Sequence, residues 1–285
     1  MLTARSPTLR DASLLALAAA AVATGSASAG APKESAPKDE KTVGTALKAS
    51  LKYADGSKNK VPAWTNIRVT IVRDGATVVT DQPLPPEAST SYTSPPKITA
   101  IDLDDDAEPE VLIDIFTAGA EPERHTVLLR KDGATYQAAV AKWGTRGYRL
   151  SDVAGGDSPE FLSADSRVPG LYDSEARGPL RVLGYDGGEV RDISRKARGE
   201  LLRDAKRHRR ALASARRNDQ DARPELAAYA LDLVRIGRIS QAQSEIRASA
   251  RRKELRGSAK SFARKLDRAM VRWGYAKRKT LAGGL

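Results

Sequence analysis

The chain has no cysteine and only two histidines among its 285 residues. The lack of cysteine excludes disulfides, thiolate metal sites and a cysteine nucleophile. His125 and His208 have no second histidine at ligand spacing, so we expect structural or solvent-exposed roles for both. Nucleophile-elbow, phosphate-loop and zinc-protease motifs are missing as well. We therefore expect a protein that is not an enzyme, with a hydrolase that uses the acidic loop described below as the alternative.

Long hydrophobic runs are also missing, apart from one short apolar stretch near the N-terminus, SLLALAAAAVA, residues 13–23. It follows Arg5 and Arg10 and precedes Ala27-Ser28-Ala29. A charged start, a short apolar run and an A-x-A site predict a signal peptide over residues 1–29, because a membrane span needs about 20 apolar residues. The alternative is an N-terminal anchor or core helix. No cysteine remains to carry a lipid, so we expect a secreted or extracytoplasmic protein without a lipid anchor or a transmembrane segment.

The net charge of +12 conceals two regions of opposite sign. Residues 30–190 hold 19 Lys+Arg against 25 Asp+Glu, 19 − 25 = −6, whereas residues 191–285 hold 27 against 10, 27 − 10 = +17. Such a division indicates two domains with different partners, or two domains that attract each other. We place a β-domain at 46–191 and a basic α-helical domain at 192–285, after a polar, disordered lead-in at 30–45.

Alternating apolar residues and Asp-Gly turns predict hairpins in the β-domain. NIRVTIVRDGATVVTDQ alternates at Ile67, Val69 and Ile71 before Asp74-Gly75. The same dipeptide recurs at residues 132–133 and 186–187, each time between strand-like runs. Three hairpins at spacings of 132 − 74 = 58 and 186 − 132 = 54 residues indicate repeated units.

An acidic loop is repeated too. AIDLDDDAEPEVLIDI at 100–115 aligns without a gap with LSDVAGGDSPEFLSAD at 150–165, so that Asp102 matches Asp152 and Glu110 matches Glu160, at an offset of 152 − 102 = 50. A unit of about 50 residues with four short strands has the size of a propeller blade.

The first copy carries acidic residues at positions 1, 3, 5, 7 and 9 of the loop: Asp102, Asp104, Asp106, Glu108 and Glu110. Oxygen ligands at this spacing form the first part of the ligand set of calcium loops. Unit charges about 4 Å apart repel by about 1 kcal/mol in water, and a hard divalent ion removes that repulsion. The alternative is a solvated acidic turn that precedes a buried strand.

DLDDDAEPEVLIDIFTAGA resembles the repeat of FG-GAP, or VCBS, proteins, in which a D-x-D-G-D-G-x-x-E/D loop leads into an apolar strand. KWGTRGYRLSDVAGGDSPEFLSAD resembles the next copy, and the likeness covers about residues 97–190. The resemblance implies propeller-type repeats and a calcium ion held by Asp102, Asp104, Asp106, Glu110 and the carbonyl of Glu108. It also implies a binding or adhesion protein at the cell surface, whose ligand is a protein or a glycan.

Two departures from the family pattern affect the expected calcium site. The family glycines fall on Asp105 and Ala107, and a left-handed alanine costs about 1–2 kcal/mol. We therefore expect low affinity, with a Kd of about 10⁻⁴ to 10⁻³ M. In the second copy Ala154 and Gly156 replace two carboxylates, so we expect that loop to be structural and free of metal.

From Ile193 onward the hydrophobic period becomes helical. We expect helices along the stripe from Ile193 to Ala205, over PELAAYALDLVRIG up to Gly237, over 240–255 and over 258–273. One face of the last is apolar: Ala259, Phe262, Ala263, Leu266, Ala269, Met270 and Trp273. The expected fold class is α+β, an N-terminal antiparallel β-domain of propeller-blade-like repeats followed by a small basic helical bundle.

Basic segments, KRHRRALASARR and RRKELRGSAK, provide the alternative function. Arginine and lysine around a bundle attract polyanions without reading a sequence. Because we expect export, an anionic polymer of the cell envelope or membrane headgroups are favoured over nucleic acid. We expect Tyr229, Phe262 and Trp273 to serve the core rather than base stacking, because they lie on apolar stripes. The remaining alternative is that the basic residues are simply solvated faces.

Overall fold

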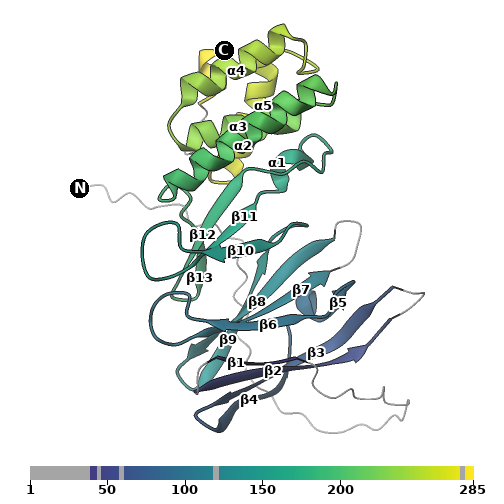
Figure 1. The fold of residues 1–285 in the computed structure, drawn as a ribbon, viewed down its shortest axis with the longest axis vertical. Helices are drawn as coiled ribbons and strands as arrows, with labels where there is room; N and C mark the ends of the chain where they lie inside the picture. Colours follow the sequence, from purple (N-terminus) through teal and green to yellow (C-terminus); the bar gives the residue numbers. More distant parts are fainter. Residues whose placement is uncertain (1–38, 44–45, 58–60, 118–121, 277–279) are drawn as a thin grey trace. The chain divides into compact units, whose positions relative to one another are not determined.

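The computed structural model describes residues 39–43, 46–57, 61–117, 122–276 and 280–285. Antiparallel sheets come first along the chain and helices later (Figure 1), which confirms the α+β class. The chain divides into two compact units, residues 1–147 with 185–190, and residues 148–184 with 191–285. The expected signal peptide lies outside the described residues.

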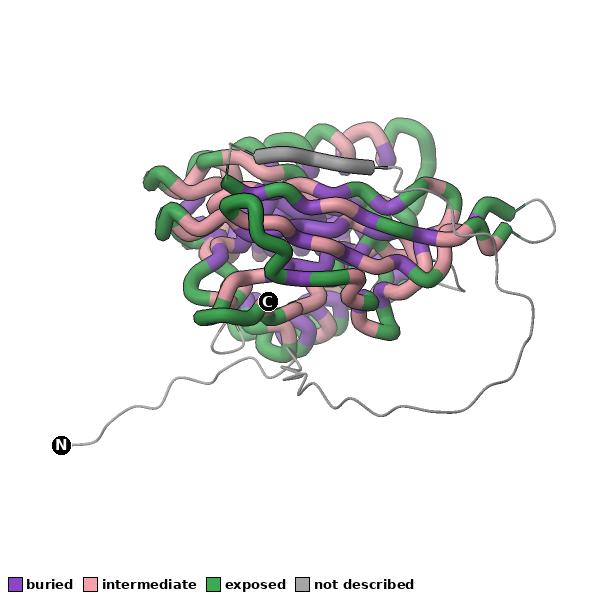
Figure 2. The backbone as a smooth tube through the Cα atoms, turned by 90° about the horizontal axis from the view of Figure 1, so that it is seen from below, coloured by how far each residue is buried: buried purple, intermediate pink, exposed green. Residues whose placement is uncertain are grey.

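A five-stranded antiparallel sheet opens the first unit: β1 Asp39–Val43, β2 Leu47–Asp55, β3 Ala63–Arg73, β4 Ala76–Pro83 and β5 Ser91–Tyr92. β1 to β4 are neighbours in sequence order, and β5 pairs with β3. Buried and more exposed residues alternate along β2 and β3, as the sequence pattern predicts, and bands of burial are visible along the strands in Figure 2.

The lead-in expected over residues 30–45 does not extend that far. Asp39–Val43 forms β1, paired with β2 from Asp39 opposite Leu51 to Val43 opposite Leu47. An edge strand is held by backbone hydrogen bonds, which do not require apolar side chains, so the polar sequence DEKTV carried no strand signal.

A four-stranded antiparallel meander follows: β6 Lys97–Ile101, β7 Glu110–Thr117, β8 Glu123–Asp132 and β9 Thr135–Lys142. Its apolar side chains share one core with the first sheet. That core includes Leu51, Ile67, Ile71, Val111, Ile113, Val127 and Leu129. The apolar run after the acidic loop is therefore β7, a central strand that is buried on both faces for most of its length.

A second four-stranded antiparallel sheet has the same strand order: β10 Tyr148–Ser151, β11 Glu160–Ala164, β12 Leu180–Asp186 and β13 Glu189–Asp192. In both meanders the acidic segment connects the first two strands, and a two-residue turn connects the last two. No closed barrel or propeller is formed within the described ranges. The propeller-blade interpretation thus stays a prediction.

The hairpin turns follow the predicted dipeptides closely. Asp74-Gly75 joins β3 to β4 with φ of 48° and 78°, the left-handed pair that an Asp-Gly turn favours. In the two later hairpins the aspartate closes the strand instead, so that Gly133-Ala134 and Gly187-Gly188 make the turns.

Five α-helices are described: α1 Arg167–Gly170, α2 Arg198–Arg217, α3 Arg223–Arg235, α4 Ile239–Arg251 and α5 Ala259–Arg272. Short 3₁₀ turns lie at Pro86–Ala88 and Ala282–Gly284. Ser258 caps α5, because its side chain accepts the N–H of Ser261 at 3.1 Å. The predicted apolar face of α5 is confirmed, and Phe262, Ala263, Leu266, Ala269 and Met270 on it are buried.

The second meander and the helices share a core, which is why the units divide at 147/148 rather than at the expected boundary of 191/192. Leu162, Val168, Leu180 and Val182 pack in the same cluster as the buried faces of α2 to α5. A β-sheet with one apolar face must bury that face against another layer, and the helices form this layer.

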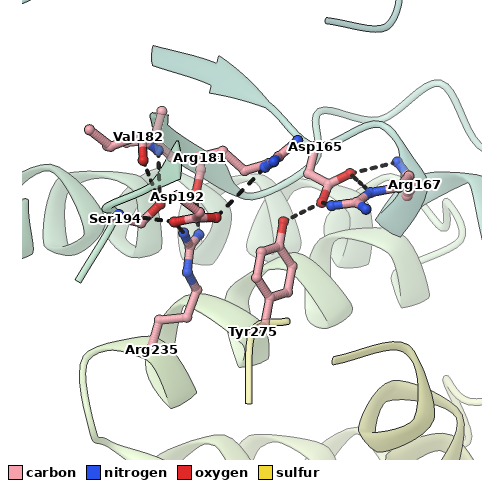
Figure 3. Close-up of polar contacts among 9 residues, drawn as sticks. Asp165, Arg167, Arg181, Val182, Asp192, Ser194, Arg235 and Tyr275 are labelled. Carbon is pink, nitrogen blue, oxygen red and sulfur yellow. Dashed lines mark hydrogen bonds and ion pairs between the residues drawn. The ribbon is translucent and has the colours of Figure 1, made fainter. Parts of the chain in front are cut away.

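Polar contacts join the same parts of the second unit (Figure 3). Asp165 accepts hydrogen bonds from Nε and Nη2 of Arg167, at 2.8 and 2.7 Å, and from the hydroxyl of Tyr275. Asp192 forms ion pairs with Arg181 at 3.7 Å and with Arg235 at 3.6 Å. These contacts join Asp165, directly after β11, to Tyr275, which follows α5. They also join Asp192, at the end of β13, to Arg235 on α3.

Candidate metal sites

Asp102 organises the acidic loop between β6 and β7. Its Oδ1 accepts the backbone N–H groups of Asp104, at 3.3 Å, and Asp105, at 2.7 Å. Its Oδ2 accepts the N–H of Ala107 at 2.9 Å. A carboxylate that bonds three amides of its own loop turns the chain sharply and keeps the following acidic residues on one side.

The loop brings three carboxylates together. One oxygen each of Asp102, Asp104 and Asp106 lies within 4.8 Å of the others. Asp105 and Ala107 have φ of 60° and 65°, the left-handed conformation that glycine adopts most readily. Neither residue is glycine, so each holds this turn with a Cβ in place.

The two glutamates have other contacts. The carboxylate of Glu108 pairs with Nη2 of Arg73 at 2.6 Å and with Nζ of Lys131 at 3.3 Å. Glu110 is buried, and its Oε2 accepts the N–H of Leu103 at 3.0 Å. Burial, together with the charges of Asp104 and Asp106, raises the pKa of Glu110 to about 7, although the hydrogen bond from Leu103 opposes this shift. Neither glutamate belongs to the group that Asp102, Asp104 and Asp106 form, and Glu110 closes the loop.

Mutual repulsion in the loop is visible at Asp104. Its Oδ2 accepts the N–H of Gly187 at 3.1 Å, and its Oδ1 has no hydrogen-bond partner. Burial raises the pKa of Asp104, and the Asp106 and Asp102 carboxylates act in the same direction, while Arg130 opposes them. A cation among the three aspartates would relieve this repulsion; a solvated turn would relieve it through water and salt.

The second copy of the loop has the same closing hydrogen bond but fewer carboxylates. Glu160 repeats the role of Glu110, because its Oε2 accepts the N–H of Val153 at 2.8 Å. Ala154 and Gly156 supply no carboxylate, and no group of three metal-binding side chains is found there among the residues that the structure describes. We keep the prediction that this loop is structural.

A second group of metal-binding side chains lies in the helical part, where the sequence reasoning placed none. One ligand atom each of Asp204, His208 and Asp232 lies within 4.8 Å of the others, and all three residues are buried. Burial raises the pKa of Asp232 to about 7, while His208, Arg235 and Arg207 oppose that shift. Chemically, this is one imidazole and two carboxylates in an apolar setting.

Both histidines are buried, and each contacts a glutamate side chain. His125 is buried and contacts Glu123 through Nε2 at 3.0 Å and the carbonyl of Glu87 through Nδ1 at 3.3 Å. His208 contacts Glu225 through Nδ1 at 2.7 Å. The difference between them is that His208 also faces the two buried aspartates.

Basic side chains cover one exposed face of α5. Lys260, Arg264 and Arg268 recur at every fourth position, are exposed, and border a shallow pocket with Ser258 and Ser261. None of the three has an ion-pair partner in the described part of the chain. Such a row of uncompensated cations is suited to anion binding.

No protein-family model matches the chain, and comparisons with curated proteins and with solved structures give no match either. Among the described residues, no helix combines the length and the apolar character that crossing a bilayer requires.

Proposed function

We propose that this chain is an exported, non-enzymatic binding protein of the cell surface, whose acidic loop holds a calcium ion at low affinity. The observation that carries the proposal is the grouping of the Asp102, Asp104 and Asp106 carboxylates on a loop with left-handed backbone at Asp105 and Ala107. Oxygen-only ligands suit Ca²⁺, and the resemblance of the sequence to FG-GAP/VCBS repeats implies the same ion.

The ion would stabilise the β-region and would take no part in a reaction. Asp104 also binds the backbone of Gly187, and Arg130 donates to the carbonyl of Gly187 at 3.1 Å. Calcium at the three aspartates would therefore stiffen the loop together with the turn at Gly187-Gly188. A rigid rim of loops on a sheet is a common surface for binding a protein or glycan ligand.

Calcium titration by calorimetry, with thermal melting, tests the proposal. We compare the wild type with Asp104→Asn/Asp106→Asn, which keeps the loop's shape and removes two charges. Binding stabilises the folded state by RT ln(1 + [Ca²⁺]/Kd), so at 100 times Kd the wild type should gain about 2.7 kcal/mol and the variant nothing.

Two controls distinguish a specific calcium site from general screening of the loop's negative charge by cations. Asp152→Asn, in the second loop, should leave the calcium response unchanged, and Mg²⁺ at equal ionic strength should give a smaller response because it requires stricter octahedral geometry. If Ca²⁺ and Mg²⁺ stabilise the wild type equally, the aspartates form a solvated turn. The same follows if Ca²⁺ stabilises Asp104→Asn/Asp106→Asn as much as it stabilises Asp152→Asn.

The basic face of α5 supports a second function, binding to an anionic polymer of the cell envelope. Its cations are exposed and lack carboxylate partners in the described residues, unlike Arg216, which is paired with Glu254 at 3.1 Å. Binding through such a face is electrostatic and independent of sequence.

Salt dependence distinguishes this function. Affinity for polyphosphate should fall steeply with salt, and Lys260→Gln/Arg264→Gln/Arg268→Gln should lower the slope of log K against log salt concentration by about two. The matched triple variant Lys206→Gln/Arg209→Gln/Arg210→Gln removes the same charge from α2 and should have a smaller effect. Equal effects would show that only the net charge matters and that α5 carries no site.

A further inference from the structure

Asp204, His208 and Asp232 come from two packed helices. Asp204 and His208 are one turn apart on α2, and Asp232 lies on α3. Each residue is at most 1% exposed. Nε2 of His208 is 3.5 Å from Oδ2 of Asp204, close to the separation of about 3.4 Å between two ligands held 2.1 Å from a tetrahedral ion.

The side chain of Asp232 has no partner of its own. It is fully buried, and neither carboxylate oxygen accepts a hydrogen bond; Nε2 of His208 has none either. An uncompensated buried carboxylate is strongly unfavourable, so such groups are normally paired or coordinate a metal. The orphaned oxygens and the orphaned nitrogen belong to the same group of three residues.

His208 is oriented for coordination. Its Nδ1 contacts Oε2 of Glu225 at 2.7 Å, and with the proton on Nδ1 the lone pair of Nε2 is free toward the two aspartates. A carboxylate behind the imidazole is the usual partner of a metal-binding histidine, because it fixes the ring and raises the basicity of the other nitrogen.

The two neighbouring arginines form their ion pairs with residues other than Asp232. Arg207 pairs with Oδ1 of Asp204 from the exposed side of α2. Arg235 is held by Asp192, the carbonyl of Leu180 and the ring of Tyr275, as Figure 3 shows in part. Within the described residues no cation lies at ion-pair distance from Asp232.

We propose that Asp204, His208 and Asp232 bind a divalent transition metal, with Zn²⁺ as the best fit, and that Glu225 positions His208. One imidazole and two carboxylates suit zinc, whereas calcium and magnesium prefer oxygen ligands alone. The ion would connect α2 to α3 inside the bundle. This site is independent of the calcium proposal, because it uses other residues and other donor chemistry.

The test uses the purified protein after treatment with a chelator. Calorimetry with Zn²⁺ should show one equivalent bound per chain, and Co²⁺ should give the visible absorption of a low-symmetry site. Asp232→Asn should weaken zinc binding by at least about 100-fold, and Glu225→Gln by about 10- to 100-fold. Asp104→Asn/Asp106→Asn should bind zinc like the wild type.

Asp232→Asn also shows whether a loss of zinc binding is caused by unfolding of the variant. The amide has the same shape without the buried charge, so the metal-free variant should melt no lower than the metal-free wild type. Loss of zinc binding in a variant that melts normally supports the site. Absence of zinc binding in the wild type, or equal binding by the wild type and Asp232→Asn, would overturn it.

Discussion

At the residue scale, Asp165 is a buried polar group that connects separate parts of the second unit. Its side chain is 2% exposed, and it receives hydrogen bonds from Arg167 and from the hydroxyl of Tyr275 (Figure 3). Asp165→Asn should lower the free energy of unfolding by about 2 kcal/mol, since Arg167 is partly exposed and can reach water. Chemical denaturation measures this, with Tyr275→Phe, which removes one hydrogen bond, expected to cost about 1 kcal/mol.

The effect of Asp165 should depend on pH. Burial opposes its charged form, but the hydrogen bonds and charge of Arg167 outweigh burial and lower the pKa of Asp165 in the folded protein. Its contribution to stability is therefore present above the ordinary pKa of about 3.9 and is lost as the pH falls below it. The difference between wild type and Asp165→Asn should shrink between about pH 4 and pH 2. A difference that stays constant would show that the charge is not what stabilises the fold.

Ala107 is the second residue that can be tested directly. Its φ of 65° is strained for any residue with a Cβ. Ala107→Gly should raise the free energy of unfolding by about 0.5–1 kcal/mol, because relief of strain exceeds the added flexibility of the unfolded chain. Ala134→Gly, at an exposed turn position without positive φ, should lower it instead. Equal effects of the two changes in thermal melting would exclude strain at residue 107.

At the scale of the elements, one glutamate closes each acidic loop onto its own first residues. Oε2 of Glu160 accepts the N–H groups of Val153, at 2.8 Å, and Ala154, at 3.4 Å. Glu160→Ala should cost about 1–3 kcal/mol, because it leaves these amides without an acceptor, while Glu160→Gln keeps an oxygen there and should cost less. Faster hydrogen exchange at Val153 in the alanine variant alone would identify the contact, and equal exchange in both would refute it.

The antiparallel hairpins could be predicted from sequence. The 50-residue offset between Asp102 and Asp152 and the Asp-Gly turns indicated where strands begin and end, because turns and alternation are local signals. β1 could not be predicted, since its sequence DEKTV lacks the alternating apolar pattern of a strand and it pairs through its backbone with β2. The division into compact units at 147/148 has a similar origin, because the packing of Leu162 and Val182 against helices is not a local property of the sequence.

The candidate site on α2 and α3 has a signal in the sequence. Asp204 and His208 lie on the same stripe as the buried Leu201, Ala205 and Leu212, and a charged residue on an apolar stripe is unusual. Asp232 likewise falls within the apolar run of α3. What the sequence alone does not contain is the pairing of the two stripes, because that depends on how α2 and α3 pack.

At the scale of the whole molecule, the described residues place one candidate ion site and one hydrophobic core in each unit. The acidic loop lies in the first unit, with a hydrophobic cluster built from two sheets, and Asp204, His208 and Asp232 lie in the second, with a cluster built from strands and helices. The donor sets differ as well: the loop offers only oxygen, and the bundle offers nitrogen and oxygen. Hard cations such as Ca²⁺ should therefore prefer the loop, and borderline cations such as Zn²⁺ should prefer the bundle.

We therefore predict that the two ions protect different parts of the chain. Calcium should slow hydrogen exchange in residues 103–117, and zinc in α2 and α3, because an ion stabilises the structure that holds its ligands. Asp104→Asn/Asp106→Asn should abolish only the calcium effect and Asp232→Asn only the zinc effect, which makes each variant the control for the other. Protection of both regions by either ion would mean that they unfold together. Protection that survives in the matching variant would place the ion elsewhere.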